Sequence, residues 1–396
     1  MTGIALIDNL IDRITSFFEA NGDPHEERNR KGLVLVIAAG LFGMLLCLWF
    51  YGRVHLYDEY NILHSAQVED IAGTQYLQMD GSILKISSDG VFCTNLANET
   101  KWSVAYSMQT PVADVNGRRA VIGEQQGDQV YVLGKDGLTG NFRTGMSIRK
   151  VRIAANGVSV ILCEDGDAAW IRMFSAEGGE IAAIKTTVRE SGYPLDVAVT
   201  PDAKRLMVSY LRPEGNELSG VITFYDFSSA SASDEDHLAA SYVYERQVFP
   251  VVFYASASMP VAVSDTGFTV FEGTKKPSPE KTVELEGEIV SMFRDAGNIG
   301  FVFHSGQTDQ KYLLDVYNYK GNRVMETSLN FEYEDICMAD GEILLSDARN
   351  LNVYRISGRQ KVSVSYEKPV ICFGQMSGSK KYFVITTDSM DQISVS

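Results

Sequence analysis

An uncharged run of 21 residues constrains this chain more than any other feature of its sequence. It extends from Gly32 to Gly52 and reads GLVLVIAAGLFGMLLCLWFYG. As an α-helix that rises about 1.5 Å per residue, it would be about 31 Å long, which matches a bilayer hydrocarbon core of about 30 Å. Core helices of globular proteins seldom run this far without a polar face. The run therefore predicts a transmembrane helix over residues 32–52.

The flanks of the run predict how the chain is oriented. Three basic residues lie within four positions before it, whereas only Arg53 follows it closely. The positive-inside rule places residues 1–31 in the cytoplasm and residues 53–396 outside it. A cleaved signal peptide is disfavoured, because the apolar core exceeds the usual 7–15 residues and no small-residue cleavage site follows. We expect an uncleaved signal anchor and a single-pass membrane protein.

The predicted cytoplasmic tail contains one helical pattern. Ile4, Ile7, Ile11, Ile14 and Phe18 recur at helical spacing, which favours an amphipathic helix over residues 4–19. The sequence supports three interpretations of this helix equally: it lies on the inner membrane surface, it pairs with a partner, or it belongs to an inert tail.

The charge balance excludes one class of partner. Lys and Arg total 35 against 51 Asp and Glu, a formal net charge of −16. A chain this acidic repels phosphate backbones, so we expect no nucleic-acid binding. An acidic domain outside the membrane also stays soluble and does not adhere to an anionic membrane surface.

Beyond a membrane-proximal linker over residues 53–73, the pattern changes from helical to strand-like. Short runs rich in β-branched and aromatic residues are separated by Asp-Gly and Asn-Gly dipeptides, which favour hairpin turns. Examples are Asp80-Gly81, Asp89-Gly90, Asn116-Gly117, Asp136-Gly137, Asn156-Gly157, Asp165-Gly166 and Asp340-Gly341. Residues 74–396 therefore read as an all-β domain.

The strands of this domain repeat weakly. A unit of turn, apolar strand, polar turn and aromatic strand recurs about every 44 residues, within the ~40–50 of a four-stranded propeller blade. The copies begin at Asn116, Asn156, Pro201, Ala257, Ala296, Asp340 and Gly378. We predict a β-propeller with seven blades, with six or eight as alternatives.

The two ends of the domain predict how the ring closes. The last unit stops at Ser396 after about three strands, so one strand is missing from its blade. The start of the domain offers further strands, SILKIS, GVFCTN and KWSVAY. Pairing the two termini in one blade would close the ring and leave no exposed sheet edge.

The stretch Tyr57–Val115 resembles a family of uncharacterised proteins, a domain of unknown function. Its signature here is the turn at Asp89-Gly90 followed by a strand with Trp102, which is also similar to pyrroloquinoline-quinone-type repeats. The stretch TPDAKRLMVS is similar to YVTN-like blades. The resemblance implies a short inner tail, one membrane span and an extracytoplasmic propeller in the cell envelope of a Gram-positive bacterium. It implies no catalytic residues.

The residues that usually carry catalysis show no pattern. No HExxH, GxSxG or phosphate-binding loop motif occurs. Only His304 belongs to a predicted blade strand, where a satisfied structural residue is expected more often than a general base. His25, His55, His64 and His237 fall in the tail, the linker and an inserted loop at 228–237.

Cofactor and metal sites are equally unmarked. Trp102 and Trp170 occupy strand positions typical of packing between blades, rather than the floor of a quinone site. Asp234-Glu235-Asp236 lacks the alternating ligand spacing of a calcium loop and reads as a solvated charge run. Cys93, Cys163, Cys337 and Cys372 are far apart, form no zinc motif, and are expected to be buried free thiols.

These observations favour a binding or scaffolding module at the cell envelope, with a protein or glycan partner. We predict no catalytic, cofactor-binding or metal-ligating residue and no cofactor. Two alternatives stay open: a propeller enzyme, either a carbohydrate-active hydrolase or a quinone oxidoreductase, and a sensor that relays binding outside the cell to the helix at residues 4–19.

Overall fold

The computed structural model describes residues 37–45, 54–166, 168–188, 191–215, 217–228, 237–307 and 310–396. The chain divides into two compact units, Met1–Leu56 and Tyr57–Ser396. The predicted helix at 4–19 and the acidic run Asp234–Asp236 lie outside the described residues.

The first unit corrects the prediction of a transmembrane helix over residues 32–52. The structure describes one helix there, over 37–45. Within the described ranges, no helix has both the length and the apolar character that crossing a membrane requires.

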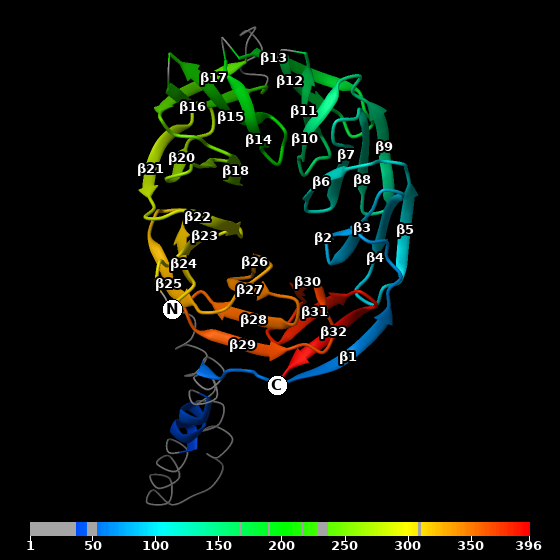
Figure 1. Ribbon diagram of the computed structural model, residues 1–396, viewed down its shortest axis with the longest axis vertical. Coiled ribbons are helices and arrows are strands. Elements are labelled where there is room, and N and C mark those ends of the chain that lie inside the picture. Colours follow the sequence, from blue (N-terminus) through cyan, green and yellow to red (C-terminus); the bar gives the residue numbers. More distant parts are fainter. Residues whose placement is uncertain are drawn as a thin grey trace, which may run out of the picture. The chain divides into compact units, whose positions relative to one another are not determined.

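The second unit is a ring of eight four-stranded antiparallel sheets, each a propeller blade (Figure 1). In each blade the first strand lies nearest the axis and the fourth lies at the rim. Blades 1 to 4 comprise β2 Gln75–Met79, β3 Ser82–Ile86, β4 Gly90–Thr94, β5 Thr100–Ala105; β6 Pro111–Asn116, β7 Arg119–Glu124, β8 Gln129–Gly134, β9 Gly137–Arg143; β10 Ser147–Ile153, β11 Ser159–Asp165, β12 Ala168–Phe174, β13 Glu180–Thr187; and β14 Tyr193–Val199, β15 Arg205–Glu214, β16 Glu217–Asp226, β17 Leu238–Glu245. Blades 5 to 8 comprise β18 Val251–Ser256, β19 Met259–Val263, β20 Gly267–Glu272, β21 Ser278–Glu284; β22 Ile289–Arg294, β23 Asn298–His304, β24 Tyr312–Asn318, β25 Arg323–Leu329; β26 Asp335–Ala339, β27 Glu342–Ser346, β28 Asn350–Arg355, β29 Gln360–Ser365; and β30 Val370–Gln375, β31 Lys381–Thr386, β32 Ser389–Val395, β1 Tyr60–Gln67.

Two of the predicted dipeptide turns have the backbone of a tight hairpin turn. Asp80-Gly81 connects β2 to β3, and Asp340-Gly341 connects β26 to β27. Both residues of each pair have positive φ, between 46° and 73°. That backbone matches a type I′ turn, which Asp-Gly adopts readily and which suits the twist of the flanking strands.

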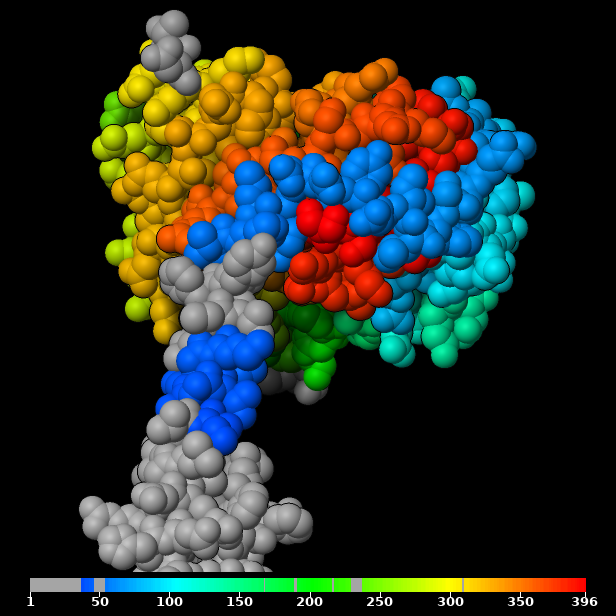
Figure 2. Space-filling view, turned by 90° about the horizontal axis from the view of Figure 1, so that it is seen from below, coloured from blue at the N-terminus to red at the C-terminus, as the bar shows by residue number. Residues whose placement is uncertain are grey.

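The ring closes through its first strand. β1 runs antiparallel to β32, with Tyr60 opposite Val395 and Gln67 opposite Ser389. β1 is thus the rim strand of blade 8, whose other three strands come from the end of the chain. Figure 2 shows the blue early residues lying across the red C-terminal ones. The predicted pairing of the two termini in one blade is confirmed.

The prediction of seven blades is wrong, because the strands that it assigns to the closure of the ring form a complete blade of their own. SILKIS, GVFCTN and KWSVAY belong to β3, β4 and β5 of blade 1, and β2 completes that sheet. The strand that closes the ring is β1, which falls inside the predicted linker 53–73. Most β1 side chains are exposed, so the strand lacks the apolar alternation by which strands are recognised.

The hydrophobic core is divided among the seams between blades. In the described part of the propeller, eight apolar clusters each join two neighbouring blades. The seam between blades 8 and 1 has five buried apolar residues, against nine or more at every other seam. The ring is therefore least apolar where it closes.

Candidate functional site

The histidines do not converge in the structure. His304 ends β23, is exposed, and stacks on Tyr312 with ring centroids 5.5 Å apart. His64 lies on β1. His237 directly precedes β17, and the centroid of its ring lies 4.6 Å from that of Phe227. His25 lies outside the described residues.

The two predicted packing tryptophans sit at blade seams. Trp102 on β5 packs against the cluster between blades 1 and 2, and its indole N–H donates to the carbonyl of Lys135 at 2.8 Å. Trp170 on β12 packs at the seam of blades 2 and 3, with the Lys185 ammonium 5.5 Å from its ring. Both positions fit a packing role.

The four cysteines of the propeller are free thiols. Cys93 and Cys163 are buried, whereas Cys337 and Cys372 are half-buried on neighbouring inner strands, β26 and β30. Burial, followed by the charge of Asp335, raises the pKa of Cys337 and that of Cys372 to about 12. Across the described ranges, no three His, Cys, Asp or Glu side chains are grouped as a metal ion would need.

Polar side chains on the inner strands connect neighbouring blades. Asp196 on β14 accepts from Arg152 at 2.8 Å, from Lys150 at 3.0 Å and from the backbone N–H of Val252 at 3.0 Å. It thereby ties blade 4 to blades 3 and 5. Asp114 on β6 accepts from the backbone N–H of Ile153 at 2.8 Å and does the same for blades 2 and 3. These groups satisfy one another, which indicates a structural role.

A cavity of about 850 Å³ lies at the seam of blades 3 and 4. Glu164, one of three charged residues in its lining, is engaged by the Tyr193 hydroxyl at 2.5 Å and by Arg149 at 3.2 Å. Its lining also includes Gly166 and Val188, which directly precede positions outside the described residues.

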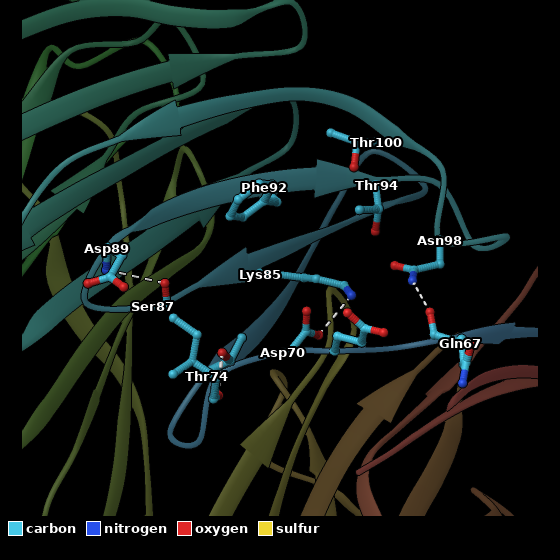
Figure 3. A pocket seen from close by; sticks show the side chains of 12 residues that line it. Gln67, Asp70, Thr74, Lys85, Ser87, Asp89, Phe92, Thr94, Asn98 and Thr100 are labelled. Carbon is cyan, nitrogen blue, oxygen red and sulfur yellow. Dashed lines mark hydrogen bonds and ion pairs between the residues drawn. The ribbon is translucent and has the colours of Figure 1, made fainter. Parts of the chain in front are cut away.

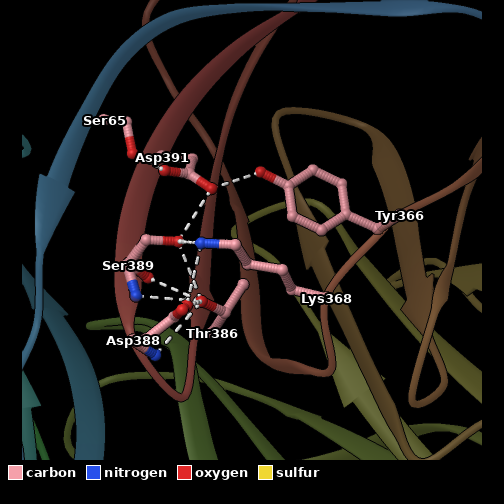
Figure 4. Close-up of polar contacts among 7 residues, drawn as sticks. All are labelled: Ser65, Tyr366, Lys368, Thr386, Asp388, Ser389 and Asp391. Carbon is pink, nitrogen blue, oxygen red and sulfur yellow. Dashed lines mark hydrogen bonds and ion pairs between the residues drawn. The ribbon is translucent and has the colours of Figure 1, made fainter.

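The polar network around Asp391 holds the closing strand in place (Figure 4). The buried Asp391 carboxylate on β32 accepts from Ser65 of β1 at 2.5 Å, from Tyr366 at 2.5 Å and from Ser389 at 3.0 Å. Beside it, Lys368 contacts Asp388 at 3.0 Å. This network fixes the register of β1, from which the chain passes directly into blade 1.

A cleft opens where the chain passes from β1 to β2, and we refer to it as the closure cleft (Figure 3). Its volume is about 520 Å³, within the range of small-molecule sites. It is lined by Gln67, Glu69, Asp70, Ile71, Thr74, Lys85, Ser87, Asp89, Phe92, Thr94, Asn98 and Thr100. The cleft occupies the seam with the fewest buried apolar residues.

The floor of the closure cleft is an ion pair. Lys85 on β3 is buried, and its Nζ lies 2.7 Å from Asp70 Oδ2. The Tyr76 hydroxyl donates to the same oxygen at 2.9 Å. Burial, and then the bond to Asp70, raises the pKa of Tyr76 well above its usual value. The floor is therefore fixed in geometry and close to electrically neutral.

Two apolar side chains are exposed in the cleft. Phe92 stands opposite Lys85 in the β3–β4 pairing and is 46% exposed, although Val91 and Cys93 beside it are buried. Ile71, on the connection from β1, is 51% exposed. An aromatic ring left open beside polar groups presents a flat contact surface.

Hydroxyl and amide groups complete the cleft. Thr94 is 2% exposed, and its hydroxyl finds no hydrogen-bond partner within the described residues. Asn98 donates to the Gln67 carbonyl at 2.6 Å, which joins blade 1 to the end of β1. The Ser87 hydroxyl lies 3.2 Å from the Gly90 carbonyl. A buried hydroxyl without a partner costs about 1–3 kcal/mol, so the Thr94 site favours a ligand that supplies one.

These features define an eight-bladed β-propeller with a preformed polar cleft at its closure. The family model described as a family of unknown function, DUF5711, matches residues 53–395. The chain therefore belongs to the DUF5711 family, and the predicted resemblance to an uncharacterised family with a propeller fold is confirmed. A comparison with curated proteins found no match.

Several solved propellers share the fold. Sqt1 from Saccharomyces cerevisiae has 10% identity and a TM-score of 0.55, covering 86% of this chain and all of its own. BamB from Moraxella catarrhalis has 11% identity and a TM-score of 0.54, covering 85% of this chain and all of its own. Apo AztD from Citrobacter koseri has 10% identity and a TM-score of 0.52, covering 75% of this chain and 87% of its own. At these identities the likeness shows the fold.

Proposed function

We propose that the propeller is a binding module and that the closure cleft is its recognition surface. One observation carries the proposal: Phe92 is held open on a central strand of blade 1, beside polar groups whose positions are fixed. An exposed aromatic ring in a concave, partly polar setting is a usual feature of binding sites. The ion pair below it keeps the cleft in one shape without a ligand.

The chemistry of the cleft supports binding rather than catalysis. General acid–base catalysis needs a group that is able to exchange a proton with the substrate near neutral pH. Asp70 and Lys85 are engaged with each other at 2.7 Å, and no histidine lines the cleft in the described structure. The two other carboxylates of the lining, Glu69 and Asp89, are exposed to solvent. The Ser87 hydroxyl donates to the Gly90 carbonyl at 3.2 Å, so its proton is already engaged.

The architecture supports the same proposal. Each described seam carries its own apolar cluster. Asp196 and Asp114 add polar links between neighbouring blades, and Asp391 links the first and last strands of the chain. A ring built this way is rigid, so a ligand meets a preformed surface and loses little affinity to ordering. The overall charge of −16 disfavours nucleic acid, and we propose a protein or a glycan as the partner.

Affinity capture with matched variants tests this function. The full chain, the variant Phe92→Asp and the control Leu138→Asp are immobilised and exposed to an extract of the native cells. Leu138 lies on rim strand β9 and is 48% exposed, so the control adds the same charge at an equally exposed apolar position. Bound proteins and glycans are then identified by mass spectrometry.

We expect the full chain and Leu138→Asp to retain the same molecules and Phe92→Asp to lose at least one of them. Equal retention by all three would show that the cleft is not the recognition surface. The location at the cell envelope stays a prediction. Protease treatment of intact cells checks it, because a propeller outside the cytoplasm is expected to be cleaved and one inside it is expected to be protected.

A further inference from the structure

We infer that the closure cleft binds an electrically neutral sugar ring of a glycan. This inference rests on the proposed binding function and names the ligand class for the same site. Three features of the cleft support it: the open ring face of Phe92, the Thr94 hydroxyl that has no partner within the described residues, and the Lys85–Asp70 ion pair that leaves the floor close to neutral.

The apolar part of the cleft matches one face of a pyranose. A sugar ring carries its C–H bonds on one face and its hydroxyls around the edge, so it stacks on an aromatic ring while its rim stays polar. Phe92 supplies that ring, and Ile71 adds a second exposed apolar group. Figure 3 shows Phe92 on the strand next to Lys85, so polar atoms lie within reach of a ring stacked there.

The polar part of the cleft matches hydroxyl groups. A sugar hydroxyl both donates and accepts, as does the Thr94 hydroxyl, which is buried and has no partner within the described residues. Thr100, on the neighbouring strand β5, adds a second hydroxyl to the same cleft. Carboxylates such as Glu69 accept from hydroxyl donors. A polyol is thus a ligand that satisfies every type of group present.

The charges of the lining disfavour acidic sugars. Lys85 and Asp70 compensate each other on the floor, which leaves Glu69 and Asp89 as the remaining charges of the lining. These two carboxylates repel acidic sugars. The same two carboxylates would also attract the cations of a basic peptide. The open Phe92 ring face and the buried Thr94 hydroxyl are instead matched by a sugar ring. We therefore argue for the neutral sugar, and the basic peptide becomes an outcome of the test.

A glycan array tests the inference directly. The labelled full chain, Phe92→Ala, Thr94→Val and the control Leu138→Ala are applied to immobilised neutral, amino and acidic oligosaccharides and to oligolysine peptides. Titration then measures affinity for any neutral oligosaccharide that binds. We expect the full chain and Leu138→Ala to bind at least one neutral oligosaccharide with equal affinity, and Phe92→Ala to bind it about tenfold more weakly.

Thr94→Val separates ligand contact from structural effects. Valine has a similar shape but no hydroxyl, so this variant removes a buried unpartnered group. We expect it to unfold at the same or a higher temperature than the full chain and yet to bind the sugar several-fold more weakly. Unchanged affinity would remove Thr94 from the ligand contacts.

The outcomes distinguish the two proposals. Absence of binding to every neutral oligosaccharide, or binding to oligolysine that Phe92→Ala loses, overturns the sugar inference while a binding function at the cleft can stand. Neutral sugar binding that Phe92→Ala leaves unchanged places the sugar elsewhere and also overturns it. If Phe92→Asp retains every captured molecule, the proposed function itself fails.

Discussion

The Ser65 hydroxyl donates a 2.5 Å hydrogen bond to Asp391, although the two residues are 326 positions apart in the chain. Ser65 lies on the first strand of the propeller and Asp391 on the last, so this bond joins the two ends of the ring. The same carboxylate accepts from Tyr366 and Ser389, which makes Asp391 the centre of the closure.

Replacing Asp391 should weaken the ring more than replacing its neighbour. In Asp391→Asn an amide N–H₂ faces hydroxyl donors, and we expect the free energy of unfolding to fall by about 1–3 kcal/mol. Asp388→Asn is the control, because that carboxylate is 61% exposed and solvent screens its pairing with Lys368. Urea unfolding measures both. Equal losses would contradict the central position of Asp391.

Asp196→Ala should be more damaging still. The variant leaves Lys150, Arg152 and the Val252 N–H without their shared acceptor at the inner strands. We expect a loss of about 3–5 kcal/mol in the free energy of unfolding. The comparison is Asp128→Ala, whose partner Arg143 lies at the surface and for which about 0–1 kcal/mol is expected. A loss at Asp196 no larger than at Asp128 would refute the bridging role.

Asp114 should make the propeller less stable as pH rises. Burial raises the pKa of Asp114, even though Arg152 and the Ile153 N–H act to lower it. The folded state then holds the proton more tightly than the unfolded state, so stability falls as pH rises from about 3.8 through the folded pKa. Asp114→Asn should therefore be more stable than the parent at pH 7, and the difference should disappear below pH 3.8.

Urea unfolding between pH 3.5 and 7 provides that measurement. Asp136→Asn serves as the control, because the Asp136 side chain is 88% exposed and its replacement should give no pH-dependent difference. A stability difference at Asp114 that grows toward low pH would have the wrong sign and reject the explanation.

Cys337 and Cys372 should react slowly with alkylating reagents. Because burial and Asp335 raise the pKa of both thiols to about 12, their thiolate fraction at pH 8 is about a thousandfold below that of a thiol with a pKa of 9. We expect iodoacetamide to modify both far more slowly than free cysteine, with faster reaction in Asp335→Asn. Peptide mass spectrometry follows each site, and rates equal to free cysteine would disprove the prediction.

The repeat could be predicted from the sequence because its signal is local. Each copy found, such as those at Asn116 and Asp340, corresponds to the two central strands of one blade. Both faces of these strands pack against neighbouring blades, and turns such as Asp340-Gly341 mark their ends. β1 gives no such signal. As a rim strand it pairs with β32 alone, and most of its side chains face solvent, so it resembles a linker.

The closure cleft could not be predicted for a related reason. Phe92 reads as one more apolar strand residue between Val91 and Cys93. Its exposure follows from the path of residues 68–74, which leaves one face of blade 1 open, and from a seam that joins the two ends of the chain. Thr94 likewise has an ordinary strand pattern, and its lack of a partner is a property of the packed ring.

The use of β1 as a rim strand also has a consequence for biosynthesis. A ribosome that adds about 5–20 residues per second reaches Asp391 roughly 16–65 s after it has added Ser65. Throughout that interval the first strand has no partner, and one flank of blade 1 is not covered by a neighbouring blade. Nascent chains of this protein should therefore depend on a holding chaperone until β32 has been synthesised. A ribosome that stalls before β32 should leave an unclosed arc of blades that is prone to aggregate.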